Sequence, residues 1–199
     1  MTQSTPNIAA LIGSRICHDL ISPVGAVSNG LELLEMTGSA KSPEMSLVSE
    51  SAASASARIR LFRIAFGASS EGQQVAAQEV GDILETLYAE ARTDLRWQVR
   101  GSHDRTLMKA ALLALLCVEN AVPGNGTITV SLLDNRWSVR AEAARLTRDP
   151  ALWALFNGAP IPDDLPPAAV QFALLPELLE QLGRKAKLQD SQTELEMAF

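Results

Sequence analysis

A stripe of aliphatic residues near the N-terminus constrains the fold of this chain more than any other feature. Its members recur every three or four positions: Ile8, Ile12, Ile16, Leu20, Val24, Val27, Leu31 and Leu34. That spacing predicts one long amphipathic helix that buries a single face. Thr5 is a suitable cap and Pro6 a suitable first helical residue, while Gly38 is a natural stop. We therefore expect a helix that begins near Thr5 and ends near Gly38.

His18 lies off this stripe, on a side of the helix where the other residues are small or polar. These residues are Ser14, Ser22, Gly25 and Asn29. Small side chains allow the surface of another protein to come close to the imidazole. We therefore expect His18 to face water and to be accessible to a partner.

A second apolar repeat follows the first. Its members alternate by three and four positions: Met45, Val48, Ala52, Ala55, Ile59, Phe62 and Phe66. This is the spacing of a heptad seam, so residues 1–68 are predicted to form a helical hairpin. Two helices cannot enclose a core by themselves. A second copy would cover both stripes in a symmetric homodimer with a four-helix bundle and two exposed His18 faces. The alternative is a bundle with later helices of the same chain.

The pattern changes after a small, polar stretch at residues 67–74, which predicts a linker. Beyond it, residues 74–199 alternate between helical and strand-like segments. Helices are expected at 75–91 and 105–121, and strands at 94–100, 127–133, 136–141, 186–189 and 194–199. A short helix is expected to open at Asp149-Pro150, and a separate helix to follow Pro166-Pro167 and end at Gly183. Asp104 is a helix cap and Asp134-Asn135 a two-residue hairpin turn. This order predicts an antiparallel or mixed sheet covered on one face by helices, so the chain is expected to be α+β.

Composition excludes several classes of partner. The chain has 199 residues and a net charge of −6, with no run of Lys or Arg that could neutralise nucleic-acid phosphates. No apolar run approaches the roughly 18 to 20 residues of a membrane span, and the N-terminus lacks the layout of a signal peptide. Cys17 and Cys117 do not indicate a disulfide framework. We expect a cytoplasmic protein that binds neither nucleic acid nor membrane.

The residues around His18 carry a resemblance to a known family. The string H-D-L-I-S-P at residues 18–23 resembles the H-box of sensor histidine kinases and histidine phosphotransferases. The specific part runs from Arg15 to Leu34 and reads R-x-C-H-D-L-x-S-P-x-G-A-x-x-N-G-L-E-L-L. Because the H-box histidine is phosphorylated in those families, the resemblance implies that His18 is the phosphoacceptor.

The second part of the chain resembles the ATP-binding domain of histidine kinases, the Bergerat fold, in the order of its elements. The helix that ends at Glu119-Asn120 resembles the N-box helix, where an Asn helps to hold the magnesium of the nucleotide. An ATP-binding member then shows an Asp-x-Gly-x-Gly stretch and a glycine-rich lid, but residues 139–145 contain no glycine and 159–173 no Gly-x-Gly. Only glycine lets backbone amides close on phosphates without a Cβ in the way. We therefore expect no nucleotide, cofactor or metal in this chain.

An intact H-box hairpin joined to a glycine-free kinase-like domain resembles the dimeric histidine phosphotransferases of the ChpT type, from alphaproteobacterial phosphorelays. That family shuttles a phosphoryl group between receiver-domain aspartates through a phosphohistidine. The resemblance implies a homodimer. Its implied partners are the receiver domain of a CckA-like hybrid histidine kinase and the CtrA-like and CpdR-like response regulators. Mg²⁺ is expected in the partner receiver domain.

Each residue near His18 has an expected role. Asp19 is expected to orient the imidazole or accept its proton, and Arg15 to screen the charge of the phosphohistidine. Pro23 removes a backbone hydrogen bond to residue 19 and loosens the helix after the histidine. The residues expected to contact a receiver are Ser14, Ser22, Pro23, Gly25 and Asn29.

Two other functions stay open from the sequence. One is a histidine kinase that autophosphorylates from ATP, and the other is a dimeric adaptor in which His18 is incidental. His103-Asp104 repeats the dipeptide of the H-box, but a capping role for Asp104 explains it. The four side chains Cys17, His18, His103 and Cys117 lack the spacing of a metal site.

Overall fold

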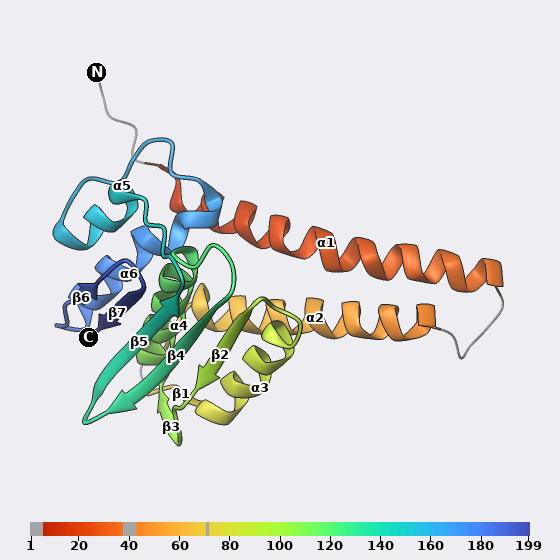
Figure 1. The fold of residues 1–199 in the computed structure, drawn as a ribbon, viewed down its shortest axis with the longest axis horizontal. Helices are drawn as coiled ribbons and strands as arrows, with labels where there is room; N and C mark the ends of the chain where they lie inside the picture. Colours follow the sequence, from red (N-terminus) through yellow and green to blue (C-terminus); the bar gives the residue numbers. More distant parts are fainter. Residues whose placement is uncertain (1–5, 38–42, 71) are drawn as a thin grey trace.

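Two long antiparallel helices project from one end of a layered α/β body (Figure 1). The computed structural model describes residues 6–37, 43–70 and 72–199. The helices are α1 (Ile8–Thr37) and α2 (Pro43–Ala65), so the predicted hairpin is confirmed. The start predicted at Pro6 is wrong by two residues, because the Asn7 carboxamide oxygen accepts from the Ala10 amide at 3.1 Å and caps the helix there. Thr5 and Gly38 lie outside the described residues.

The end of the hairpin that joins the body packs against the rest of the chain. In α2 the residues buried in the main core are Ala57, Leu61, Phe62, Ile64 and Ala65. In α1, Ile8, Leu11 and Ile16 pack against the same core. Later helices of the same chain therefore cover this end of both apolar stripes.

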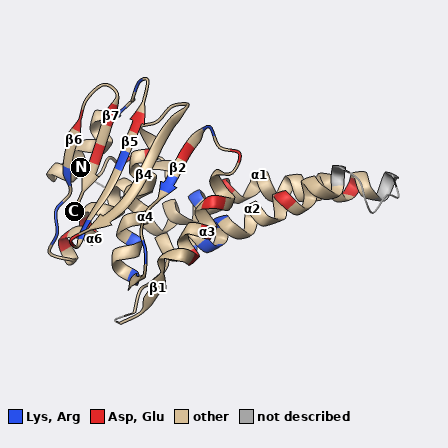
Figure 2. Ribbon diagram, turned by 60° about the horizontal axis from the view of Figure 1, so that its bottom comes forward, with Lys and Arg blue, Asp and Glu red and all other residues tan. Residues whose placement is uncertain are grey.

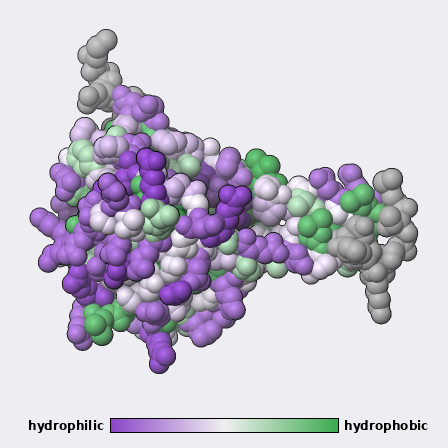
Figure 3. Space-filling view, viewed as in Figure 1, coloured by the Kyte–Doolittle hydropathy of each residue, from purple (hydrophilic) through white to green (hydrophobic). Residues whose placement is uncertain are grey.

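The rest of the hairpin keeps its apolar side chains at the surface. Val24 and Leu31, which the stripe predicts to be buried, are 51% and 49% exposed in the single chain. Among the helix residues whose exposure the structure describes, the other large apolar residues at the surface are Ile21, Leu33, Met45, Leu47 and Ile59. Figure 3 shows hydrophobic residues at the surface of the hairpin, and Figure 2 shows that charged residues are sparse along it.

A five-stranded mixed sheet forms one layer of the body. Its order is β2 (Thr93–Trp97), β4 (Gly126–Leu133), β5 (Arg136–Ala143), β7 (Glu194–Ala198) and β6 (Lys187–Asp190). β2 runs parallel to β4, and the other neighbours are antiparallel. Asp134 and Asn135 have φ of 49° and 62°, which confirms the predicted two-residue turn between β4 and β5.

Helices cover one face of this sheet, as predicted (Figure 1). They include α3 (Ala77–Tyr88), α4 (Arg105–Asn120) and α6 (Val170–Gln181), while the short α5 (Pro150–Trp153) and the 3₁₀ turns η1 (Ala154–Asn157) and η2 (Pro167–Ala169) lie between β5 and α6 in the chain. The core lies between the layers. Strand residues that alternate toward the helices are buried there, among them Ile128, Val130, Trp137, Val139 and Met197.

The region before α4 differs from the predicted elements. The helix predicted at 75–91 begins only at Ala77, because Gln74–Ala76 forms strand β1 and pairs with β3 (Ser102–Asp104) in a separate small sheet. The strand predicted at 94–100 ends at Trp97. Gly101, at a φ of +83°, turns the chain into β3. Asp104 caps α4 as predicted, since its carboxylate accepts from the Thr106 amide at 2.8 Å.

None of the helices in the described part of the chain is both long enough and apolar enough to cross a membrane.

Candidate functional site

His18 lies in the middle of α1 with 81% of its side chain exposed. Its Nδ1 is 3.0 Å from Oδ1 of Asp19. A carboxylate can only accept, so this contact places the ring proton on Nδ1 and leaves the lone pair on Nε2. The predicted exposure of His18 is confirmed, and its Nε2 is available to an approaching electrophile.

Asp19 is held from the other side by Arg15. The Arg15 Nε donates to Asp19 Oδ2 at 2.7 Å, and the two side chains are 14% and 15% exposed. Burial by itself raises the pKa of Asp19, but hydrogen bonds from His18 and Arg15, together with the charges of Arg15 and Arg58, outweigh it. The pKa of Asp19 therefore lies below its ordinary value of 3.8. At neutral pH Asp19 is a carboxylate, which is the form that accepts the Nδ1 proton.

Arg15 also reaches across to the second part of the chain. Its Nη1 donates to the carbonyl oxygen of Ala168 at 2.5 Å and to Oε1 of Gln171 at 3.3 Å. Gln171 is 1% exposed, and its Nε2 donates to the carbonyl oxygen of Leu116 at 3.3 Å. A continuous chain of hydrogen bonds thus runs from α4 and α6 to the imidazole of His18.

Three further polar side chains lie within electrostatic reach of this series of hydrogen bonds: Arg58, Tyr88 and Glu119. Burial raises the pKa of Glu119 above its ordinary value of 4.5, although the hydrogen bond from Tyr88 and the charges of Arg15 and Arg58 act against it. Burial, and then the nearby Glu119 carboxylate, raise the pKa of Tyr88 well above 10.0. The Arg58 Nε is buried without a hydrogen-bond partner among the described residues.

The raised pKa of Glu119 makes a prediction about stability. A carboxyl group with a raised pKa in the folded state stabilises the fold while it is protonated. That contribution is complete below the unfolded value of about 4.5 and is lost as the pH rises through the folded pKa. Glu119→Gln, which stays neutral and keeps an acceptor for Tyr88, is therefore expected to raise the thermal midpoint at pH 7 and to leave it unchanged below pH 4.5.

Thermal unfolding followed by circular dichroism at the two pH values measures this difference. Glu180→Gln removes an exposed carboxylate from α6 and is the matched control, expected to change neither midpoint. A Glu119→Gln variant that is less stable than the unmodified chain at pH 7 would show that the carboxylate form is favoured in the fold.

A groove of about 440 Å³ lies beside His18, between the two helices of the hairpin and the end of α3. Its lining includes the following residues of α1, α2 and the turn after α3: His18, Asp19, Ser22, Pro23, Ala26, Leu47, Glu50, Ser51, Ser54, Arg58 and Glu90. A partner that covers His18 is thus in a position to contact both helices and the second part of the chain.

The structure places the predicted partner-binding residues as follows. Ser14, Ser22 and Asn29 are exposed, while Pro23 and Gly25 are half-buried. A side chain added at Gly25 would meet nothing within 4 Å, so the surface is open there. Pro23 stays inside a continuous α1. Their role in binding stays a prediction.

The remaining conspicuous residues take no part in this arrangement. His103 bonds through Nε2 to the Arg100 carbonyl at 2.7 Å, and its ring packs edge-on against Trp137 at 5.5 Å. Cys17 is exposed and Cys117 is buried. Within the described residues, no group of three His, Cys, Asp or Glu side chains is placed to share a metal ion.

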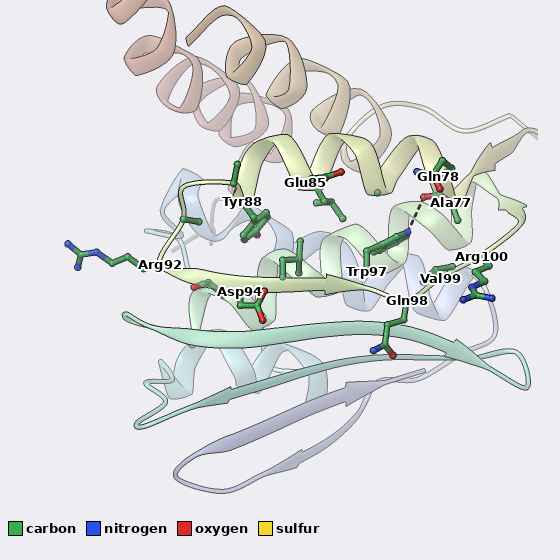
Figure 4. Close-up of a pocket in the computed structure, with 16 residues that line it drawn as sticks. Ala77, Gln78, Glu85, Tyr88, Arg92, Asp94, Trp97, Gln98, Val99 and Arg100 are labelled. Atoms are coloured by element: carbon green, nitrogen blue, oxygen red, sulfur yellow. Dashed lines mark hydrogen bonds between the residues drawn. The ribbon is translucent and has the colours of Figure 1, made fainter. Parts of the chain in front are cut away.

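A larger hollow of about 1120 Å³ lies between α3 and β2, and His18 is not among the residues that line it (Figure 4). The Trp97 Nε1 donates across one end of it to the Ala77 carbonyl at 3.0 Å. Arg92 extends outward at one end, and Arg100 lies at the opposite end. The charged side chains therefore do not converge on a common point in this hollow.

Part of the segment between β5 and α6 is packed into the core, while residues 144–151 and 156–164 are exposed or half-buried. Trp153 and Phe172 meet edge to face with ring centroids 5.2 Å apart, and Phe156 lies 6.1 Å from Phe172. Leu152, Leu155 and Leu165 of the same segment are also buried. These apolar contacts hold the middle of the segment against α6.

Sequence reasoning pointed to His18, Asp19 and Arg15 through the H-box string, and the structure brings these three together. It did not find Gln171, which lies 156 residues from Arg15 in sequence. Nor did it assign a role to Arg58 or Tyr88. An isolated Gln in an apolar helix carries no pattern that identifies its partner, so only the fold reveals these contacts.

Known proteins match this chain over both of its parts. A family model of the histidine phosphotransferase C-terminal domain matches residues 77–194. The protein phosphotransferase ChpT of Brucella abortus (strain 2308) is 35% identical, with 94% of this chain and 92% of the relative covered. The solved structure of a bacterial phosphotransferase is 30% identical with a TM-score of 0.78, over 100% of this chain and 98% of that one. The last two matches span the helical hairpin as well as the sheet.

Proposed function

We propose that this chain, which belongs to the histidine phosphotransferase family, carries phosphoryl groups between receiver-domain aspartates as a phosphohistidine at His18. The observation that supports this assignment most directly is an 81% exposed imidazole whose Nδ1 is bound by Asp19. That arrangement presents the nucleophilic Nε2 to the solvent on a surface that a partner can reach.

The proposed step is a displacement at phosphorus. The Nε2 lone pair of neutral His18 attacks the phosphorus of an aspartyl phosphate, the bond from phosphorus to the aspartyl oxygen breaks, and the receiver carboxylate leaves. The Nδ1 proton remains shared with Asp19, whose negative charge balances the imidazolium character of the product. The reverse displacement onto a second receiver regenerates neutral His18. Such transfers depend mainly on positioning and charge stabilisation.

The partners in this proposal are the receiver of a CckA-like hybrid histidine kinase and the receivers of CtrA-like and CpdR-like response regulators. Mg²⁺ belongs to the receiver, where it stabilises the charge of the phosphoryl group. Support for a docking role of the second part of the chain comes from Glu90, which lines the groove beside His18. A contact that includes this part more readily reaches the roughly 1,200 Å² of specific interfaces.

The proposal includes a homodimer in the cytoplasm. The apolar surface on the hairpin supports the dimer, because side chains such as Val24, Leu31 and Ile59 are about half exposed in the single chain. The scarcity of cysteine supports a reducing compartment.

The decisive experiment is a transfer assay. A receiver domain is first phosphorylated on its aspartate by a labelled acyl phosphate in the presence of Mg²⁺. It is then mixed with this chain, and the label on each protein is followed over time. We expect label to move to this chain and then to a second, uncharged receiver. A chain that binds receivers but never acquires label would be an adaptor, and the proposal would fail.

ATP is expected neither to bind this chain nor to change its transfer rate. The physical reasons are the absence of glycine at 139–145 and the burial of Trp153, which lies between β5 and α6 where a lid would lie, against Phe172 of α6. Calorimetric titration with Mg-ATP should show no saturable binding up to about 1 mM. The free energy of ATP binding is therefore expected to be weaker than about −4.1 kcal/mol, the value for a Kd of about 1 mM. Saturable binding together with labelling of His18 from ATP would favour a histidine kinase.

A further inference from the structure

The buried amide of Gln171 is the feature that the function above leaves unexplained. It is a polar side chain with 1% exposure in an otherwise apolar part of α6, among Phe172, Ala173 and Leu175. Both ends of its amide are used, since Oε1 accepts from Arg15 and Nε2 donates to the Leu116 carbonyl. A buried amide with fixed partners at both ends holds a defined position.

We propose that Gln171 is a positioning residue for phosphoryl transfer, which acts on His18 through Arg15 and Asp19. The inference rests on the proposed role of His18 as the phosphoacceptor. It assigns to the second part of the chain a function in the chemical step, in addition to any contact with the receiver.

The geometry of Arg15 transmits this effect. Its guanidinium is planar, so the direction of Nε toward Asp19 and that of Nη1 toward Gln171 and Ala168 are fixed relative to one another. The hydrogen bonds that Gln171 and Ala168 accept from Nη1 therefore also fix the direction in which Nε donates to Asp19. The carboxylate that receives this bond then presents its other oxygen to Nδ1 of His18 at 3.0 Å.

Loss of the Gln171 acceptor should loosen this arrangement. The Ala168 carbonyl would then be the one remaining acceptor for Nη1. The guanidinium could rotate about this hydrogen bond and change the direction of Nε relative to Asp19. Asp19 would then hold Nδ1 less firmly, and the His18 ring would sample the tautomer that carries the proton on Nε2. That tautomer has no lone pair at the exposed nitrogen, so transfer slows although the receiver still docks.

The test combines a rate with a spectroscopic signature in the full-length chain. Gln171→Met removes both ends of the amide at similar volume, and Gln171→Glu keeps an acceptor for Arg15 but loses the amide donor to Leu116. Gln181→Met changes an exposed glutamine of the same helix and is the matched control. Long-range ¹⁵N–¹H spectra report the tautomer of His18, and transfer from a labelled receiver gives the maximal rate and the KM.

We expect Gln171→Met to lower the maximal rate about 10- to 100-fold, leave the KM for the receiver unchanged and weaken the Nδ1–H signature. Gln171→Glu should retain the rate and the signature, and Gln181→Met should match the unmodified chain. If Gln171→Met does not fold, Gln171→Asn takes its place, because it keeps the amide but shortens its reach to Arg15, and it is expected to act in the same direction.

Two results would overturn the inference. One is an unchanged rate and tautomer in Gln171→Met. The other is an equal loss in Gln171→Met and Gln171→Glu with an unchanged tautomer, which would assign Gln171 to structure alone. Failure of the underlying function is recognised separately, because either the unmodified chain would acquire no label from the receiver, or His18→Gln would acquire as much label as the unmodified chain.

Discussion

His18→Gln is expected to reduce phosphoryl acceptance from a charged receiver to the background of a reaction without this chain. A carboxamide nitrogen has no basic lone pair at neutral pH, so it cannot displace the aspartyl oxygen. The side chain is 81% exposed, and Asp19 keeps its hydrogen bond from Arg15. The free energy of unfolding should therefore change by no more than about 0.5 kcal/mol.

The measurement is the time course of label on this chain, together with thermal unfolding of each variant. His103→Gln is the control, because His103 contacts Arg100 and Trp137 and lies outside the hydrogen-bond chain of His18. It should transfer at the rate of the unmodified chain. Full labelling of His18→Gln would place the phosphoacceptor elsewhere.

Local signals in the sequence predicted most of the elements correctly. Asp104 caps α4, Asp134-Asn135 turns the β4–β5 hairpin, and Asp149 caps α5 by accepting from the Ala151 amide at 2.9 Å. In each case a side chain bonds to its own neighbouring backbone, or a short turn requires a particular residue type. Such features are determined within a few residues, so the sequence pattern is sufficient to predict them.

Features that depend on distant partners were not predicted. β1 becomes a strand because residues 74–76 pair with 102–104, although the residues themselves continue a helical pattern. The hydrogen bond from Arg15 to Gln171 likewise joins two segments that only the fold brings together. The apolar stripe of α1 predicted one buried face, but it did not reveal that Ile16 packs within the chain while Val24 stays exposed. The periodicity of apolar residues identifies which face of a helix is apolar, but it does not identify the element or subunit that packs against that face.

Ile59→Asp is expected to convert a homodimer into monomers. Ile59 is 53% exposed in the single chain and belongs to the seam that a second hairpin would cover. An aspartate placed there loses its hydration in the dimer and finds no partner, at a cost of about 3 kcal/mol or more. A symmetric dimer contains the substitution twice, so about 6 kcal/mol should weaken association about 10⁴-fold. Val24→Asp, on the other helix, is expected to act in the same direction.

Sedimentation equilibrium measures the result directly, because the chain has a mass of 21.3 kDa and the dimer twice that. Leu133→Asp is the matched control, since Leu133 is 74% exposed at the tip of the β4–β5 hairpin and lies outside the helical seam. That variant should remain dimeric. A monomeric unmodified chain would contradict the proposed dimer. Equal dissociation by Leu133→Asp would show that added charge, and not loss of the seam, separates the subunits.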